Sequence, residues 1–311
     1  MIESAKKVME CFGVKREESV LIVVDTSTPD SIASSLFDTA KKIGCEVMIL
    51  TILPRMRHGE ELPAVVAEAM KWADVVIAPT TFSLTHTQAK INACKAGARI
   101  ASMPGITENM MTSGGITAEC VRINEIAKRL YNRLEKVRKV RIITELGTDI
   151  EFDLDGCSWK MDTGLCQEPG CSSNLPAGEL YIAPRNANGS FFVDGSMSGF
   201  GLLDSPLEFT VKDRYVTDIK GKHSEKMRSI LDRVGEKAFN IAELGIGINP
   251  EARLIGNVLE DEKVGGTVHI ALGDNSGFGG DVIAGIHLDG IIKKPVLYLD
   301  GEKFILSYDN I

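Results

Sequence analysis

The sequence lacks the motifs that identify several common classes of enzyme. No G-x-G-x-x-G motif follows the first apolar segment, and no G-x-x-x-x-G-K-[ST] motif occurs, so binding of a dinucleotide or of ATP is not predicted. No G-x-S-x-G motif is present either, because Met197 takes the central position of GSMSG. A serine hydrolase of the usual kind is therefore not expected.

The net charge and the short length of the hydrophobic runs exclude further classes of protein. The net charge is −8 and no cluster of Lys and Arg is longer than a few residues, so nucleic acid and anionic lipid are not expected partners. No apolar run is long enough to span a bilayer, and the N-terminal residues do not resemble a signal peptide. We expect a cytoplasmic protein that acts on a short peptide or another small molecule.

The seven cysteines are scattered and odd in number. They are Cys11, Cys45, Cys94, Cys120, Cys157, Cys166 and Cys171. The last three have a C-x8-C-x4-C spacing that lacks the C-x2-C pair of many zinc sites. We expect free thiols in a reducing compartment.

Residues 1–135 alternate strand-like runs with helix-like segments. The runs lie at 20–25, 46–51, 75–79 and 99–104, and the segments between them have apolar residues at three- and four-residue spacing. This alternation predicts a doubly wound, Rossmann-like α/β domain. Ligands of such sheets usually bind at the carboxyl ends of strands, here 25–28 and 79–83. We interpret the nearby His86 as a surface or helix-start residue.

Residues 136–311 have a different pattern. The segment 116–140 is expected to be one long helix that runs into a strand and connects the two halves. After it, apolar residues alternate with a period of two, interrupted by a helix near 223–235. Asp300-Gly301 predicts a tight hairpin turn. The second domain is therefore predicted to be mostly antiparallel β (α+β), so that the whole chain is of the α/β class.

Ionisable residues stand inside the apolar runs of this second half. His287 and Asp289 alternate on one expected strand, so both side chains lie on one face, about 6 to 7 Å apart along the backbone. His269 lies within TVHIALG and Glu243 within FNIAELGIGINP. A carboxylate in such surroundings is costly to bury unpaired. The alternatives are a solvated strand face for His287 and Asp289 and a hydrogen-bonded core histidine for His269.

A further carboxylate, Glu179, precedes the apolar run in NLPAGELYIAP. By itself it is typical of a solvated loop residue. Together, three carboxylates and two histidines form a mixed oxygen and nitrogen set that is large enough for two divalent ions and a bound water. The sequence therefore predicts a metal-binding domain in its second half.

The order of these motifs resembles a known family. LPAGELYIAP, then AELGIGINP, then DEK followed by HIALG, then HLD, are similar to the M29 metallopeptidases, the aminopeptidase T/S type that includes leucyl aminopeptidases, most clearly over 170–300. The resemblance implies a homodimer with a two-ion site of Zn, Co or Mn. The ligands implied are Glu179, Glu243, His269, His287 and Asp289.

Two departures concern the catalytic residues. The family has a tyrosine seven residues beyond the histidine of HIALG, where this chain has Ser276. The family also tends to have DEN where this chain has Asp261-Glu262-Lys263, with a longer spacer before His269. We take Ser276 and Glu262 as candidate catalytic residues, with Glu262 as a base or a support for a ligand. A surface turn at EDEK is the alternative.

The sequence also resembles the Fe(II) dihydroxypyridine dioxygenases, through the GIGINP turn and the final HLD. Those enzymes have a histidine where this chain has Glu243, and a His-His-Asp set suits one Fe(II). Because Glu243 is a carboxylate, we expect a metal-dependent aminopeptidase-like hydrolase. The alternatives are a ring-cleaving dioxygenase with a single Fe(II), acting on a small hydroxylated aromatic, and a metal-binding homologue without peptidase activity.

Overall fold

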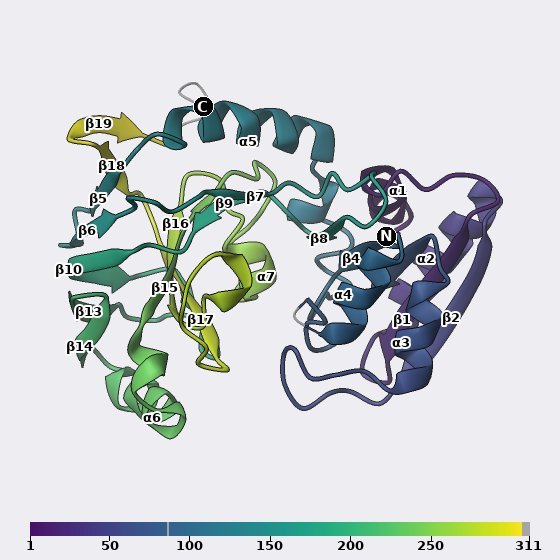
Figure 1. The fold of residues 1–311 in the computed structure, drawn as a ribbon, viewed down its shortest axis with the longest axis horizontal. Coiled ribbons are helices and arrows are strands. Elements are labelled where there is room, and N and C mark those ends of the chain that lie inside the picture. Colours follow the sequence, from purple (N-terminus) through teal and green to yellow (C-terminus); the bar gives the residue numbers. More distant parts are fainter. Residues whose placement is uncertain (86, 307–311) are drawn as a thin grey trace. The chain divides into compact units, whose positions relative to one another are not determined.

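The structure is a computed structural model that describes residues 1–85 and 87–306, so His86 lies outside the described residues. The chain forms two compact units (Figure 1). Unit 1 comprises Met1–Asn124, Asp162–Gly178 and Pro250–Ala252. Unit 2 comprises Glu125–Met161, Glu179–Asn249 and the chain from Arg253 onward. No described helix has both the length and the apolar character needed to cross a membrane.

Unit 1 is built on a five-stranded parallel sheet with the order β2-β1-β3-β4-β8. Its strands are β1 (Ser19–Asp25), β2 (Glu46–Ile52), β3 (Val75–Ala78), β4 (Arg99–Ser102) and β8 (Ser172–Asn174). The first four agree closely with the apolar runs of the sequence, because β1, β3 and β4 are almost completely buried. The short polar strand β8 was not anticipated.

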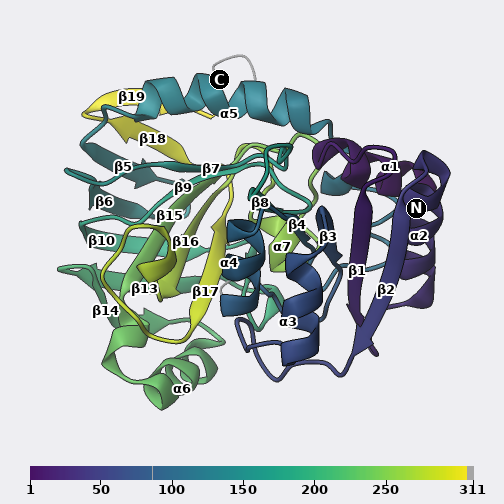
Figure 2. The same ribbon diagram turned by 45° about the vertical axis from the view of Figure 1, so that its right-hand side comes forward.

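Four helices of unit 1 accompany this sheet. They are α1 (Ile2–Cys11), α2 (Asp30–Ile43), α3 (Ala64–Lys71) and α4 (Gln88–Lys95). A fifth helix, α5 (Cys120–Leu134), begins in unit 1 and continues into unit 2. α3 and α4 pack on β1, β3 and β4 through a shared apolar cluster that includes Val66, Met70, Val76 and Ala93 (Figure 2). As predicted for the segment 116–140, a helix is followed by a strand, since α5 ends at Leu134 and β5 begins at Lys139. The helix begins later than predicted, because a 3-10 turn occupies Gly115–Thr117.

One expectation about the cysteines is wrong. Cys166 and Cys171 form a disulfide, whereas the other five cysteines are free. The Cα atoms of the pair lie 5.5 Å apart, which suits a disulfide. The expectation failed because a spacing in sequence does not give the distance between two Cα atoms in a loop.

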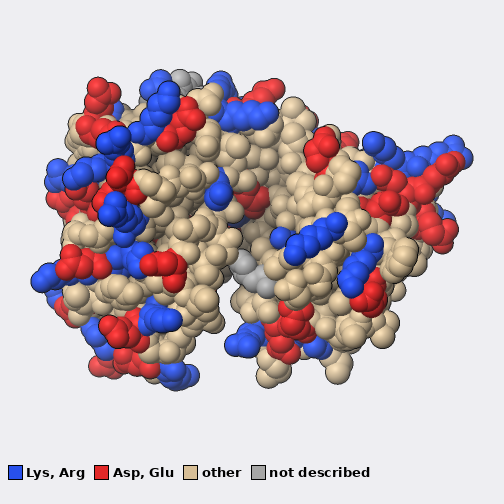
Figure 3. Space-filling view, in the orientation of Figure 1, with Lys and Arg blue, Asp and Glu red and all other residues tan. Residues whose placement is uncertain are grey.

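Unit 2 contains two seven-stranded sheets, the first with the order β14-β13-β10-β6-β5-β18-β19. Its strands are β5 (Lys139–Ile143), β6 (Asp149–Asp153), β10 (Asn186–Val193), β13 (Leu207–Lys212), β14 (Tyr215–Lys220), β18 (Val296–Leu299) and β19 (Glu302–Ile305). All neighbouring strands are antiparallel. The outer surface of the unit carries interspersed acidic and basic side chains (Figure 3).

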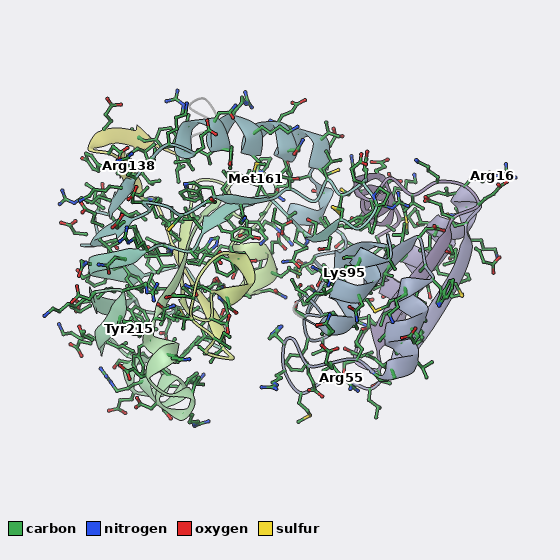
Figure 4. All side chains as sticks on the ribbon, in the orientation of Figure 1. Arg16, Arg55, Lys95, Arg138, Met161 and Tyr215 are labelled. Carbon is green, nitrogen blue, oxygen red and sulfur yellow. A yellow bond between two sulfur atoms is a disulfide. The ribbon has the colours of Figure 1, made fainter. Side chains whose placement is uncertain are left out.

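The predicted hairpin joins β18 to β19. Asp300 and Gly301 have φ values of 48° and 91°, the left-handed region that a two-residue type I′ turn requires. The Asp300 carboxylate accepts hydrogen bonds from the backbone N–H groups of Arg138, which is labelled in Figure 4, and Lys139. The turn is thereby fixed to the start of β5.

The second sheet of unit 2 has the order β12-β11-β17-β16-β15-β9-β7. Its strands are β7 (Lys160–Asp162), β9 (Glu179–Ile182), β11 (Ser196–Met197), β12 (Gly201–Leu202), β15 (Ile241–Gly247), β16 (Val268–Gly273) and β17 (His287–Ile292). The central strands β15 and β16 are wholly buried. Two helices, α6 (Ser224–Val234) and α7 (Val258–Asp261), complete the unit. The predicted fold class is confirmed.

Candidate metal centre

Four neighbouring strands of the second sheet carry the five predicted ligands. Glu179 begins β9, Glu243 lies on β15, His269 lies on β16, and His287 and Asp289 lie on β17. Their order in the sheet is β17-β16-β15-β9. Segments separated by more than 100 residues of sequence therefore bring these side chains together.

The side chains form two adjoining groups. In the first, the Asp289 cluster (Glu243, His287 and Asp289), His287 Nε2 lies 3.3 Å from Asp289 Oδ1 and 3.5 Å from Glu243 Oε2. In the second, the Glu179 cluster (Glu179, Glu262 and His269), His269 Nε2 lies 3.3 Å from Glu179 Oε2. His269 Nε2 is also 3.2 Å from Glu243 Oε1, so Glu243 joins the two groups.

Burial makes these groups unusual. His269 is completely buried, and Glu179, Glu243 and Asp289 are each only 6% exposed, whereas the side chain of His287 keeps 32% of its accessible area. Carboxylate oxygens and imidazole nitrogens both offer lone pairs, and Zn, Mn, Fe and Co bind such mixed sets. The donor set of the Asp289 cluster therefore fits a divalent cation, and His287 marks its accessible side.

Glycine makes room for the buried histidine. Gly245 on β15 pairs with His269 on β16, and a Cβ atom at Gly245 would overlap the imidazole ring. The ring can therefore lie across β15 only because residue 245 has no side chain. Gly247 has a similar role, since its Cβ atom would overlap the carbonyl oxygen of Val264.

Lys263 lies within the site, although it was not among the residues predicted from the sequence. Its ammonium Nζ lies 2.5 Å from Glu179 Oε1 and 2.5 Å from Glu262 Oε1, and the residue is completely buried. The interpretation of EDEK as a surface turn is wrong, because Glu260 and Asp261 are also completely buried. The signal that could have found Lys263 was the departure from the DEN of the M29 family.

Ser276, the other candidate catalytic residue, contacts the site indirectly. Its Oγ donates to Asp274 Oδ1 at 2.8 Å. The backbone carbonyl of Asp274 in turn accepts a hydrogen bond from His287 Nδ1 at 2.8 Å. Since Nδ1 donates, Nε2 of a neutral His287 is free to act as an acceptor toward the cluster. Ser276 thus helps to hold the loop that orients His287.

The titration of His287 responds strongly to its neighbours. Burial lowers its pKa, but the carboxylates of Asp289 and Glu243 raise it further, to about 10. Burial raises the pKa of Asp289, and His287 more than offsets this, so that the value falls to about 2. In the protein without a cation, a proton on His287 therefore balances the carboxylates. A divalent ion has to displace this proton.

Glu262 titrates in the opposite direction from Asp289. Burial raises its pKa to about 8, against the lowering effect of the Lys263 ammonium and with a further raising effect from Glu179. A carboxyl group with a pKa near neutrality can hold or release a proton at physiological pH. Glu262 thus lies at the site and has a pKa in the range that a general base needs.

Comparisons with known proteins bear on the fold and on the family. No curated protein matches the sequence. Among solved structures, 2,5-dihydroxypyridine dioxygenase from Pseudomonas putida KT2440 has a TM-score of 0.82 at 18% identity, over 100% of this chain and 96% of that one. AmpT from Thermus thermophilus has a TM-score of 0.68 at 16% identity, over 99% and 98% of the two chains. At these identities both likenesses show the fold.

The family comparison covers almost the whole chain. The family model described as NicX, 2,5-dihydroxypyridine 5,6-dioxygenase, matches residues 1–308. The M29 resemblance is supported only distantly, by the fold that this chain shares with AmpT. The family match supports an enzyme, and the two clusters supply candidate ligands for a divalent metal. The chain belongs to the 2,5-dihydroxypyridine 5,6-dioxygenase family.

Proposed function

We propose that the protein is a metal-dependent dioxygenase that opens the ring of a small hydroxylated aromatic compound. The observation that carries the proposal is the Asp289 cluster, a compact set of one imidazole and two carboxylates, in a chain that matches the dioxygenase family over residues 1–308. Glu243, His287 and Asp289 would hold one Fe(II) ion. When bound, this ion would supply the one-electron chemistry that a reaction with dioxygen requires.

The surrounding residues support an aromatic substrate. The ring of Phe278 lies edge-on to that of His287, with centroids 5.9 Å apart, and edge-on to that of Tyr181, at 5.4 Å. Phe278 and Tyr181 are both half-buried, and His287 is the most accessible member of the cluster. A planar substrate would find aromatic faces beside this accessible side. Glu262 would take up a proton from a substrate hydroxyl.

A hydrolase that cleaves the N-terminal residues of peptides is the second candidate. It is favoured by Glu243, because this carboxylate stands where the dihydroxypyridine dioxygenases that the sequence resembles have a histidine, and a carboxylate-rich set suits Zn, Co or Mn. In that case a metal-activated water would attack the peptide bond. A metal-binding homologue that has lost peptidase activity is the remaining alternative.

Anaerobic purification followed by metal analysis and two assays separates these functions. We expect one iron per chain, and uptake of dioxygen with a panel of dihydroxypyridines and hydroxylated benzoates. Hydrolysis of aminoacyl anilides with two Zn, Co or Mn ions, and no dioxygen uptake, would contradict the dioxygenase and support the hydrolase. Bound metal with neither activity would support the homologue without peptidase activity.

A further inference from the structure

We infer that the Lys263 ammonium is a built-in cation that takes the place of a second metal ion, so that each chain binds a single divalent ion, at the Asp289 cluster. The inference rests on the metal site of the proposed function. It concerns how many ions the six ionisable residues of the two clusters accept. The argument depends on the contacts of Lys263, on its burial, and on the contrast between the two clusters.

The contacts place the ammonium among the atoms that a second ion would need. Lys263 Nζ bridges Glu179 Oε1 and Glu262 Oε1, at 2.5 Å from each. These two carboxylates belong to the Glu179 cluster, whose third member is His269. A divalent ion bound to the same oxygens would lie within a few ångströms of Nζ, where two positive charges repel strongly in buried surroundings. The ammonium and a second ion therefore exclude each other.

The backbone holds Lys263 in this position. Its N–H donates to the carbonyl of Glu260 at 3.0 Å, and its own carbonyl accepts from the N–H of Asn249 at 2.8 Å. Gly247 has no side chain, and a Cβ atom there would lie only 2.9 Å from the carbonyl carbon of Lys263. The lysine is completely buried, so its ammonium cannot turn toward solvent without moving this segment. The cation is therefore a fixed part of the fold.

Among the residues that the structure describes, no lysine or arginine forms an ion pair with the carboxylates of the Asp289 cluster. Within the described residues, the ion-pair partners of Glu243 and Asp289 are the imidazoles of His269 and His287. A neutral imidazole offers a lone pair to a metal, whereas an ammonium group offers none. The Glu179 cluster thus contains a fixed cation, whereas each side chain of the Asp289 cluster can offer a lone pair to a metal.

Metal stoichiometry tests the inference without reference to activity. Metal-free protein is titrated with Co(II) by calorimetry, and the bound metal is counted by elemental analysis after dialysis. We expect one ion per chain in the wild type and two in Lys263→Met, which keeps the length of the side chain but removes its charge. The matched control Lys293→Met, at a half-exposed lysine after β17, should bind one ion.

An anomalous-scattering map of Co(II)-loaded wild-type crystals provides a second measurement that does not depend on the folding of a variant. A single peak among Glu243, His287 and Asp289 is expected. A second peak between Glu179 and Glu262, two ions in the wild type, or one ion in a folded Lys263→Met variant would overturn the inference and leave the metal site intact. A wild type that binds no ion would overturn the proposed function, and the inference with it.

Discussion

Each unit buries carboxylates, but the two units satisfy them differently. In unit 1, Asp25 is 2% exposed at the end of β1 and accepts hydrogen bonds from the backbone N–H groups of Ser27 and Thr81 and from the Thr81 hydroxyl. In unit 2, Glu243 and Asp289 are 6% exposed and face imidazole nitrogens. N–H and O–H donors satisfy the Asp25 carboxylate without an ion, whereas the imidazole partners of Glu243 and Asp289 carry protons that a divalent ion can displace.

The comparison favours unit 2 as the place of a metal site. The carboxyl ends of β1 and β3 were a possible ligand site by analogy with other doubly wound sheets. The Asp25 carboxylate there is already engaged by the loops that follow these strands, at 27 and 81. The metal site is instead expected on strands β15 and β17, where the acidic groups face imidazole nitrogens that can also bind a cation.

The largest effect is expected at the metal ligands. Asp289→Ala and His287→Ala should each weaken metal binding by more than about 100-fold, since the loss of supporting partners alone typically weakens it 10- to 100-fold. Calorimetric titration of the metal-free proteins measures this change. Full metal content in either variant would show that the ion binds elsewhere. Asp25→Ala is the control and should bind metal as the wild type does.

Gly245→Ala tests the room that β15 leaves for His269. The added methyl group overlaps the imidazole ring, so we expect a loss of about 1 to 3 kcal/mol in the free energy of unfolding. Chemical denaturation of the metal-free protein measures it. In the background of His269→Ala the same substitution should have little effect, because the ring is absent. An equal loss in both backgrounds would mean that another contact is responsible.

Asp25→Ala tests the buried carboxylate of unit 1, which is satisfied by hydrogen-bond donors. The substitution leaves the donors at Ser27 and Thr81 without their acceptor, which should destabilise the protein by about 1 to 3 kcal/mol. Thermal unfolding with and without Co(II) measures this loss together with the stabilisation by metal. The stabilisation by metal should be unchanged. A smaller stabilisation would show that unit 1 influences the site.

The pH dependence of metal binding tests the proton on His287. The carboxylates raise its pKa to about 10 in the folded protein, above the ordinary value of about 6.5, so the metal-free fold gains stability that is complete below pH 6.5 and lost as the pH rises toward 10. An ion that displaces this proton should bind about tenfold more tightly per pH unit between pH 7 and 8. Calorimetry in buffers of different ionisation enthalpy counts the protons, and release of none would contradict the assignment.

The two units also differ in how much of their structure could be predicted from the sequence. The buried strands β1, β3 and β4 appear as apolar runs, and the candidate ligands stand out because they interrupt such runs. Strand β8 reads Ser-Ser-Asn and gains its place by pairing with β4, from which it is separated by about 70 residues of sequence. The spacing of apolar residues and the amino-acid composition of a segment do not show that it pairs with a strand so far away in the sequence.

Lys263 was missed for a related reason. A lysine beside two acidic residues has the same sequence signature in a solvated turn and in a buried ion-pair network. Only the fold shows that Gly247 lets the segment approach β15 and that Glu179 arrives from β9 to meet the ammonium. The charge balance of the site therefore depends on the tertiary fold, although most of the ionisable residues of the site can be identified individually in the sequence.

The smallest effect is expected for Ser276→Ala. Ser276 is exposed and holds the Asp274 carboxylate, whereas His287 is held by the carbonyl of Asp274, so the serine acts one step further from the ion. We expect metal affinity to fall by less than about tenfold, below the usual effect of a direct partner of a ligand. Asp274→Ala, which removes the carboxylate that organises the loop, should have the larger effect. If Ser276→Ala abolished turnover while the ion stayed bound, the hydroxyl would have to act on the substrate itself.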